Sequence, residues 1–332
     1  MVVHSLVWVV TVAVLVAILA VDILIIGRRP HEPSTRESVT WIGIYVALAV
    51  AFGIGILIFA GGRYAGEFFA GWITEYSLSI DNLFVFLVIL TRLGVPRRYQ
   101  QTALMIGIVL ALVMRGVFIA LGAAAISAFS WVFYIFGAIL LYTAVQFVRQ
   151  RQHDDSDYRE NVVIRWAKQN LPATDAYNGV RITVVENGRR LATPMLIVMI
   201  ALGTTDLIFA LDSIPAIYGL TNEPYLVFAA NVFALMGLRQ LYFLIGGLVK
   251  RLVYLSVGLA VVLAFIGVKL VLHAVHDNTL PFLNDGRPIT GVPDIGIGWS
   301  LTVIIGTLVV TTVASLAKSR RDDRSRNDAK IG

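Results

Sequence analysis

The chain has no cysteine and little charge, and each shortage removes a class of protein. Without cysteine there can be no disulfide and no thiolate metal site, so a metal would need oxygen ligands or one of five histidines. Charged residues make up 14% of the 332 residues, hydrophobic residues make up 58%, and the mean hydropathy is +0.79. A soluble core of this size cannot hold so many apolar residues. The composition predicts an all-α, polytopic membrane protein.

Several functional motifs are also missing. The sequence contains no Walker phosphate-binding motif, no zinc-protease motif and no nucleophile elbow, and no soluble domain that could house a nucleotide-driven motor. We therefore expect neither an enzyme nor a bound cofactor. The net charge of +6 is carried by loops and the tail rather than by a soluble face. It indicates orientation in the membrane, and not binding of nucleic acid.

Windows of about 20 apolar residues, the length that crosses a bilayer, predict nine membrane-spanning helices. They lie near residues 5–26, 40–60, 72–92, 101–123, 129–148, 195–215, 225–247, 253–275 and 298–317. The first has neither a basic n-region nor a cleavage site of small residues, so we expect a retained helix rather than a signal peptide.

Basic residues alternate between the loops as the positive-inside rule requires. Lys and Arg follow every odd-numbered span, as Arg28 and Arg29 do after the first, whereas loops such as 216–224 contain neither. We expect the N-terminus outside, the C-terminus in the cytoplasm and the chain in the inner or plasma membrane, with a plastid membrane left open.

One acidic pattern occurs twice within these spans. Its copies are Glu75-Tyr-Ser-Leu-Ser-Ile-Asp81-Asn82 and Asp206-Leu-Ile-Phe-Ala-Leu-Asp212-Ser213. A carboxylate at the centre of a membrane helix costs about 2.5 to 3.5 kcal/mol on insertion. Four of them in two matched places indicate a pathway for an ion.

The repetition continues beyond the acids. Arg115 lies one span after the first copy, and Arg239 lies one span after the second. Three spans then form one unit, and the second unit enters the membrane from the opposite side, which predicts an inverted pair of three-helix repeats. The expected organisation is two N-terminal helices (1–66), a first repeat (67–148), a cytoplasmic loop (149–193), a second repeat (194–276), an extracytoplasmic loop (277–297), a last helix (298–317) and a basic cytoplasmic tail (318–332).

The loop at 149–193 is polar and alternates around Asn187-Gly188, which predicts a β-hairpin with its turn at that pair. A simple connector is the favoured interpretation of the loop, and a regulatory or docking element is the alternative. The tail at 318–332 is a basic run that we expect to be disordered.

Two stretches, 205–216 and 231–243, resemble the signature of the TerC family of integral membrane proteins. Residues 75–82 and Arg115 match its first half, and Asp22 before a short basic loop fits its start. The resemblance covers nearly the whole chain. It implies a family named for tellurium resistance, with members linked to manganese export and wider kinship with transporters of the LysE type.

Among the substrates that this resemblance implies, the chemistry of the acidic residues favours a cation. Tellurite is an anion, which a cavity lined by four carboxylates would repel unless Arg115 and Arg239 dominated. Hard divalent cations such as Mn²⁺ prefer carboxylate, carbonyl and water oxygens. The expected substrate is therefore a divalent metal, most favourably manganese, and its expected coupling partner is the proton.

Helix geometry limits how the acids can act. Six residues on a continuous helix rotate by about 600° and rise by about 9 Å, so the two acids of one copy cannot both reach one ion. Either the helices are interrupted, near Ser77, Ser79 or Pro215, or the site takes one acid from each copy. We favour Asp81 and Asp212 as primary metal ligands.

The remaining metal-site residues have lesser expected roles. Asn82 and Ser213 would add neutral oxygens, while Glu75 and Asp206 would lie farther along the path as secondary ligands or proton acceptors. Supporting residues are expected at Arg115 and Arg239 as counter-charges, at Asn231 in the path, and at Lys269 in a salt bridge. A minor possibility is an outer metal site at His273 and His276 beside Asp277.

Two alternatives stay open. The acids and arginines could form a purely structural network that holds the helices together. The protein could also be a membrane organiser that does not transport and that assists membrane insertion or scaffolds a stress response through the 149–193 loop. Such an organiser should tolerate Asp81→Asn and Asp212→Asn, whereas a transporter should not.

Overall fold

The computed structural model describes most of the chain. The described residues are 5–28, 34–129, 131–150, 165, 174, 177–186, 189–245, 254–276, 289, 291–293 and 295–331, and at 19, 22–28, 150, 186, 189, 245 and 320–331 only the backbone is described. The helices are α1 (Ser5–Arg28), α2 (Thr35–Ala60), α3 (Gly62–Arg92), α4 (Arg97–Ala128), α5 (Val132–Gln150), α7 (Pro194–Tyr218), α8 (Pro224–Leu235), α9 (Leu238–Ile245), α10 (Leu255–His276) and α11 (Ile297–Ile331). The strands are β1 (Thr183–Glu186) and β2 (Arg189–Ala192).

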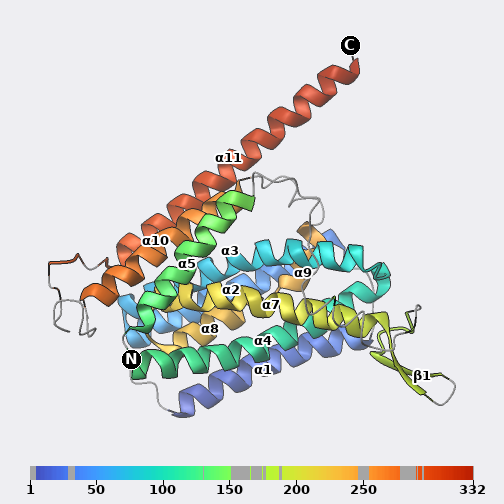
Figure 1. The fold of residues 1–332 in the computed structure, drawn as a ribbon, viewed down its shortest axis with the longest axis horizontal. Helices are drawn as coiled ribbons and strands as arrows, with labels where there is room; N and C mark the ends of the chain where they lie inside the picture. Colours follow the sequence, from blue (N-terminus) through green and yellow to red (C-terminus); the bar gives the residue numbers. More distant parts are fainter. Residues whose placement is uncertain are drawn as a thin grey trace.

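The helices form one elongated bundle, with the strands projecting from one end (Figure 1). Eight helical segments in the described part of the chain are long and apolar enough to cross a membrane, which confirms the all-α, polytopic prediction. They correspond to the second to ninth predicted spans. The first predicted span, 5–26, corresponds to the helix α1. Proline at the first position starts both α7 and α8, where its missing N–H has no helical partner to lose.

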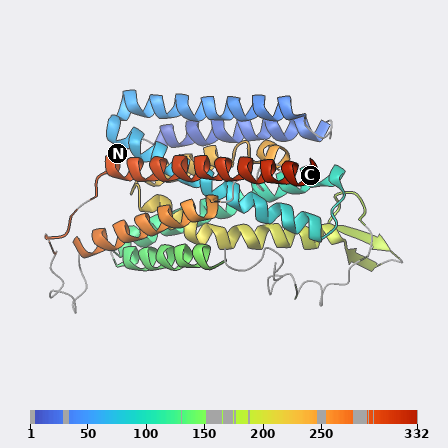
Figure 2. The ribbon, with the colours of Figure 1, turned by 90° about the horizontal axis from the view of Figure 1, so that it is seen from above.

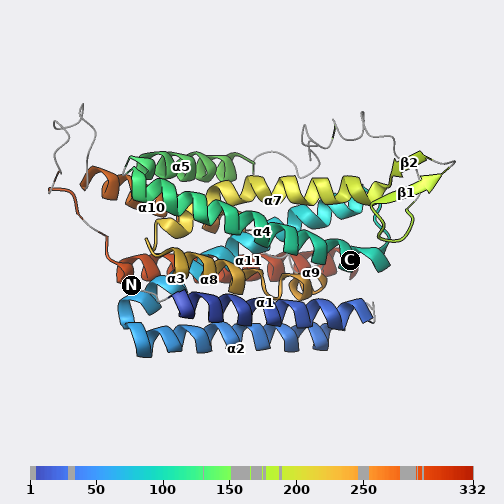
Figure 3. The same cartoon turned by 90° about the horizontal axis from the view of Figure 1, so that it is seen from below.

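The helices from the two sequence copies pack against one another. α3 contacts α8, α4 contacts α7, and α5 lies along α10. This reciprocal pattern is the one expected from two units related by a two-fold axis; the opposite orientation of the units stays a prediction. α1 and α2 both lie on the same flank of the bundle in Figures 2 and 3.

The seventh predicted span, 225–247, is not one helix. α8 ends at Leu235, Met236 takes an extended conformation (ψ 130°), and Gly237 has φ +84° before α9 begins at Leu238. The helices that carry the acidic motifs, where an interruption was considered, are continuous, and Pro215 lies in the last turn of α7. A left-handed φ suits glycine because it has no Cβ to clash.

The expectation of a disordered C-terminal tail is wrong. α11 continues without a break from Ile297 to Ile331, so residues 318–331 are helical. In Figure 1 the last part of α11 extends beyond the other helices. The apolar run and the basic run share one helix because Arg, Lys, Asp and Ala all accept helical geometry with little or moderate loss of free energy.

The predicted hairpin is present. β1 and β2 pair antiparallel, with Glu186 opposite Arg189. The turn pair, Asn187 and Gly188, lies outside the described residues, but the register leaves two residues for the connection. The hairpin is joined to α7 by Thr193, whose backbone N–H donates to the Ile182 carbonyl.

Candidate ion-binding site

Arg115 on α4 is the centre of a buried polar network. Its side chain forms ion pairs with Glu75 of α3 and with Asp206 of α7, the latter at 3.1 Å between Nη2 and Oδ1. Its Nε also donates to Asp206 Oδ2 at 3.4 Å, and Nη1 donates to Asn231 Oδ1 of α8 at 3.0 Å. Four helices therefore meet at one guanidinium group.

The burial of this network makes its pairing energetically necessary. Arg115 is 1% exposed, Glu75 0% and Asp206 3%. An ionised group taken out of water loses several kcal/mol of solvation, so it must be compensated by opposite charge and hydrogen bonds. Arginine suits this position because its planar fork can bind two carboxylates and an amide at the same time.

Glu75 and Asp206, predicted to lie farther along an ion path, both contact the same arginine. These are the first acids of the two motif copies. Arg115 also belongs to the expected supporting set, and it contacts Asn231 from that set. Whether any of these residues binds a metal stays a prediction.

The second acids of the copies, Asp81 and Asp212, form a different group. Asp81 of α3 accepts a hydrogen bond from the side chain of Ser256 at the start of α10. Asp212 of α7 is close enough to both Arg115 and Asp81 for electrostatic interaction, and the backbone N–H of Ser213 hydrogen-bonds to it. Both carboxylates are half-buried. Each motif thus contributes one acid to this pair, and the two negatively charged carboxylates repel each other.

Several buried polar atoms near these acids have no hydrogen-bond partner among the described residues. They include Glu75 Oε2, Ser213 Oγ, Asn231 Nδ2 and Thr74 Oγ1. Such atoms are uncommon in folded proteins and indicate a bound water, an ion or stored strain. They lie on α3, α7 and α8, the helices that surround Arg115.

The carboxylates alone do not complete a metal site. Within the part of the chain that the structure describes, no three or more His, Cys, Asp or Glu side chains are grouped as metal ligands would be. Any cation between Asp81 and Asp212 would need neutral oxygen ligands as well. Ser256 brings one such oxygen to Asp81; sequence reasoning missed it, because no motif marks it and only helix packing brings it there.

The other predicted residues are distributed over several helices. Asn82 is buried next to Asp81 in the sequence, and Arg239 is buried on α9, just past the break. Lys269 of α10 donates to Ser300 Oγ of α11 at 3.2 Å. His273 packs edge-on against Phe133, with ring centroids 4.9 Å apart. Asp277, the third member of the possible outer site, lies outside the described residues.

Glu67 is a buried acid that the sequence analysis did not select. It is 5% exposed at the start of α3, where Arg63 Nε donates to Oε1 at 2.9 Å and Thr221 Oγ1 donates to Oε2 at 2.7 Å. In the sequence, only its i, i+4 spacing from Arg63 indicated that Glu67 could form an ion pair. Both of its oxygens are thus occupied by protein donors.

Comparison with known proteins identifies one matching family and several related membrane proteins. A family model described as "Integral membrane protein TerC family" matches residues 60–323. An uncharacterized membrane protein of Mycobacterium tuberculosis, Rv2723, is 48% identical over 95% of this chain and 80% of its own length. An uncharacterized membrane protein of Myxococcus xanthus is 38% identical over 97% and 95%.

A further relative carries a functional name. The "Putative membrane-bound redox modulator Alx" of Escherichia coli K12 is 36% identical, and the match covers 95% of each chain. No solved structure gives a significant match to this chain.

Proposed function

Because the chain belongs to the TerC family of integral membrane proteins, we propose that it is a secondary transporter that exports a divalent metal cation, with Mn²⁺ as the favoured substrate. The cation would pass between Asp81 and Asp212 within the membrane. The proposal includes the expected coupling to protons, the location in an inner or plasma membrane, and the absence of an enzymatic reaction and of a resident cofactor.

The observation that carries this proposal is the arrangement of negative charge around Arg115. Four carboxylates belong to the two motifs, and this guanidinium pairs with two of them. The other two, Asp81 and Asp212, are left close enough to repel each other. A structural network would be expected to balance its charges, whereas a site with surplus carboxylates gains free energy when a cation or a proton enters.

The ligand chemistry favours a hydrated divalent ion. Two carboxylates and a hydroxyl oxygen, from Ser256, supply fewer oxygens than a six-coordinate ion requires. Ions that keep several waters are held in proteins by one or two carboxylates, and Mn²⁺ belongs with the cations that prefer oxygen ligands. An anion such as tellurite would be repelled by the same pair.

The two acid pairs would have separate tasks. Arg115 holds Glu75 and Asp206, so these would fix the helices and shape the field, while Asp81 and Asp212 would bind the ion and take up protons after it leaves. The name of the Alx relatives refers to redox modulation. This chain has no cysteine, so a thiol–disulfide couple cannot be its mechanism.

Transport by purified protein in liposomes tests the proposal. A Mn²⁺-sensitive dye on one side reports movement under an imposed proton gradient. Asp81→Asn and Asp212→Asn should each abolish both Mn²⁺ binding and Mn²⁺ movement, because asparagine preserves size and removes charge. Reversal of the pH gradient should change the rate.

Glu67→Gln is the matched control, since Glu67 is a buried acid of the same helix whose oxygens already have protein partners. It should retain Mn²⁺ binding. Normal Mn²⁺ movement in both aspartate variants would remove the assigned site. Absence of movement in the folded wild-type protein, with cellular function intact in the variants, would favour a membrane organiser instead.

A further inference from the structure

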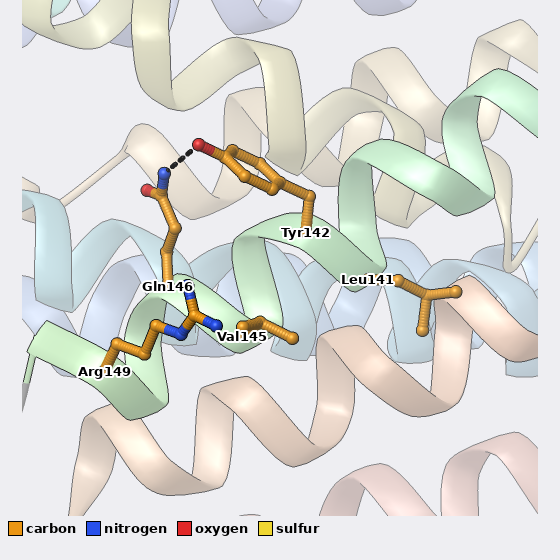
Figure 4. A pocket seen from close by; sticks show the side chains of 5 residues that line it. All are labelled: Leu141, Tyr142, Val145, Gln146 and Arg149. Carbon is orange, nitrogen blue, oxygen red and sulfur yellow. Dashed lines mark hydrogen bonds between the residues drawn. The ribbon is translucent and has the colours of Figure 1, made fainter.

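A groove lies along the second half of α5, and none of its lining residues is an acid of the candidate ion site. Its volume is about 620 Å³. The described residues that line it all come from this one helix and are shown in Figure 4: Leu141, Tyr142, Val145, Gln146 and Arg149. Leu141 also packs against Gly267 of α10. Tyr142, Val145 and Arg149 are exposed, so this surface is open to a ligand from outside the bundle.

The lining residues recur about once per turn and become more polar along the helix. Leu141 and Val145 are apolar, Tyr142 and Gln146 follow them with hydrogen-bonding groups, and Arg149 lies in the last turn. α5 has 19 residues, which is about 28 Å of helix. This is close to the thickness of the hydrocarbon layer, about 30 Å, so Arg149 reaches the headgroup level when α5 crosses the membrane.

The groove presents donors for an anionic group. Gln146 Nε2 donates to the Tyr142 hydroxyl oxygen, as Figure 4 shows, which leaves the tyrosine proton available to another acceptor. Arg149 is exposed and forms no ion pair with another described residue. A guanidinium and a phenol beside an apolar strip match a ligand that has both an anionic oxygen group and a hydrocarbon chain.

We propose that this groove binds one anionic phospholipid. Its phosphate accepts hydrogen bonds from Arg149 and Tyr142, and the first part of an acyl chain lies over Leu141 and Val145. The site is independent of ion transport, because none of these residues contacts Arg115 or its partners.

Native mass spectrometry of the full chain in detergent tests this site. The protein is incubated with phosphatidylglycerol, which is anionic, or with phosphatidylcholine, which is not. We expect one phosphatidylglycerol to be retained under conditions that remove phosphatidylcholine. Arg149→Gln should weaken that retention about fivefold, the effect of one basic residue at an anionic membrane surface, and Tyr142→Phe should weaken it less.

The control is Arg36→Gln, which changes an exposed arginine on α2 outside the groove and should leave retention unchanged. Equal retention of the two lipids, or full retention in Arg149→Gln, would overturn the proposal. Displacement by millimolar inorganic phosphate would identify a site for soluble anions. A dimer that dissociates in Arg149→Gln would show that a second copy of the chain covers this face.

Discussion

The second spans of the two sequence copies carry equivalent arginines on differently built helices. α4 is continuous for 32 residues and holds Arg115 in its middle, whereas the corresponding span is divided into α8 and α9, with Arg239 just after the break. A continuous helix fixes a buried charge rigidly. A divided helix frees backbone groups at the break and permits movement there. The comparison teaches that Arg115 can act as an anchor on a continuous helix, whereas its counterpart Arg239 stands next to a break.

The largest effect is expected when the anchor loses its charge. Arg115→Gln leaves Glu75 and Asp206 buried without a counter-ion and should lower the free energy of unfolding by about 3 to 5 kcal/mol. Denaturation in detergent, followed by circular dichroism, measures it. Arg98→Gln, at an exposed position on the same helix, should change the free energy of unfolding by less than about 1 kcal/mol. If both variants are equally stable, α4 is not the anchor.

The contact between the two halves is expected to come next in size. Asn231→Ala removes the amide oxygen that accepts from Arg115 Nη1. A hydrogen bond to a charged group contributes about 1.5 to 3 kcal/mol, so the free energy of unfolding should fall by that amount. In a double-mutant cycle with Arg115→Gln the losses should not add. Strict additivity would show that α8 and α4 are energetically separate at this point.

Replacing glycine with alanine should change the free energy of unfolding in opposite directions in the two spans. Gly237→Ala puts a side chain on a residue with φ +84°, and its Cβ would lie 3.1 Å from the Tyr45 ring. This variant should lower the free energy of unfolding by about 1 to 3 kcal/mol. Gly116→Ala in α4 meets no atom within 4 Å and should stabilise by up to about 1 kcal/mol through helix propensity. Thermal unfolding of both variants provides the measurement. A gain in stability for Gly237→Ala would mean that the break closes readily into a continuous helix.

The smallest effect concerns the link between α9 and α4. Tyr242 donates to Gln100 Oε1 at 3.0 Å, and position 118, its equivalent in α4, is already phenylalanine. Because Tyr242→Phe removes only this hydrogen bond, it should lower the free energy of unfolding by about 1 kcal/mol. Combining it with Gln100→Ala gives the coupling energy of the bond. A coupling near zero would show that packing alone holds α9 in place.

Sequence reasoning succeeded where the signal is local. Apolar runs of bilayer length located the spans, and the Asn187-Gly188 pair located a hairpin that the pairing of β1 and β2 confirms. These features depend on residues that are neighbours in the chain. The acids of the two motifs were also selected from local spacing, and the structure places them on α3 and α7.

The features that sequence reasoning missed depend on packing. A helix tolerates a single glycine at a cost of about 1 kcal/mol, so Gly237 alone does not predict a break. In the structure a Cβ at this position would lie 3.1 Å from the Tyr45 ring. Ser256 and Thr221 reach Asp81 and Glu67 only because distant helices pack together. The helical tail shows that a basic composition does not by itself indicate disorder.

The length of α11 has a practical consequence. Its 35 residues form a rod of about 52 Å, whereas the hydrocarbon layer is about 30 Å thick. If this helix crosses the bilayer, about 20 Å of it extends beyond the hydrocarbon layer as a rigid helical segment. A fluorophore fused there would be held at a fixed distance from the membrane, so its quenching by a lipid-borne acceptor would read the tilt of that rod.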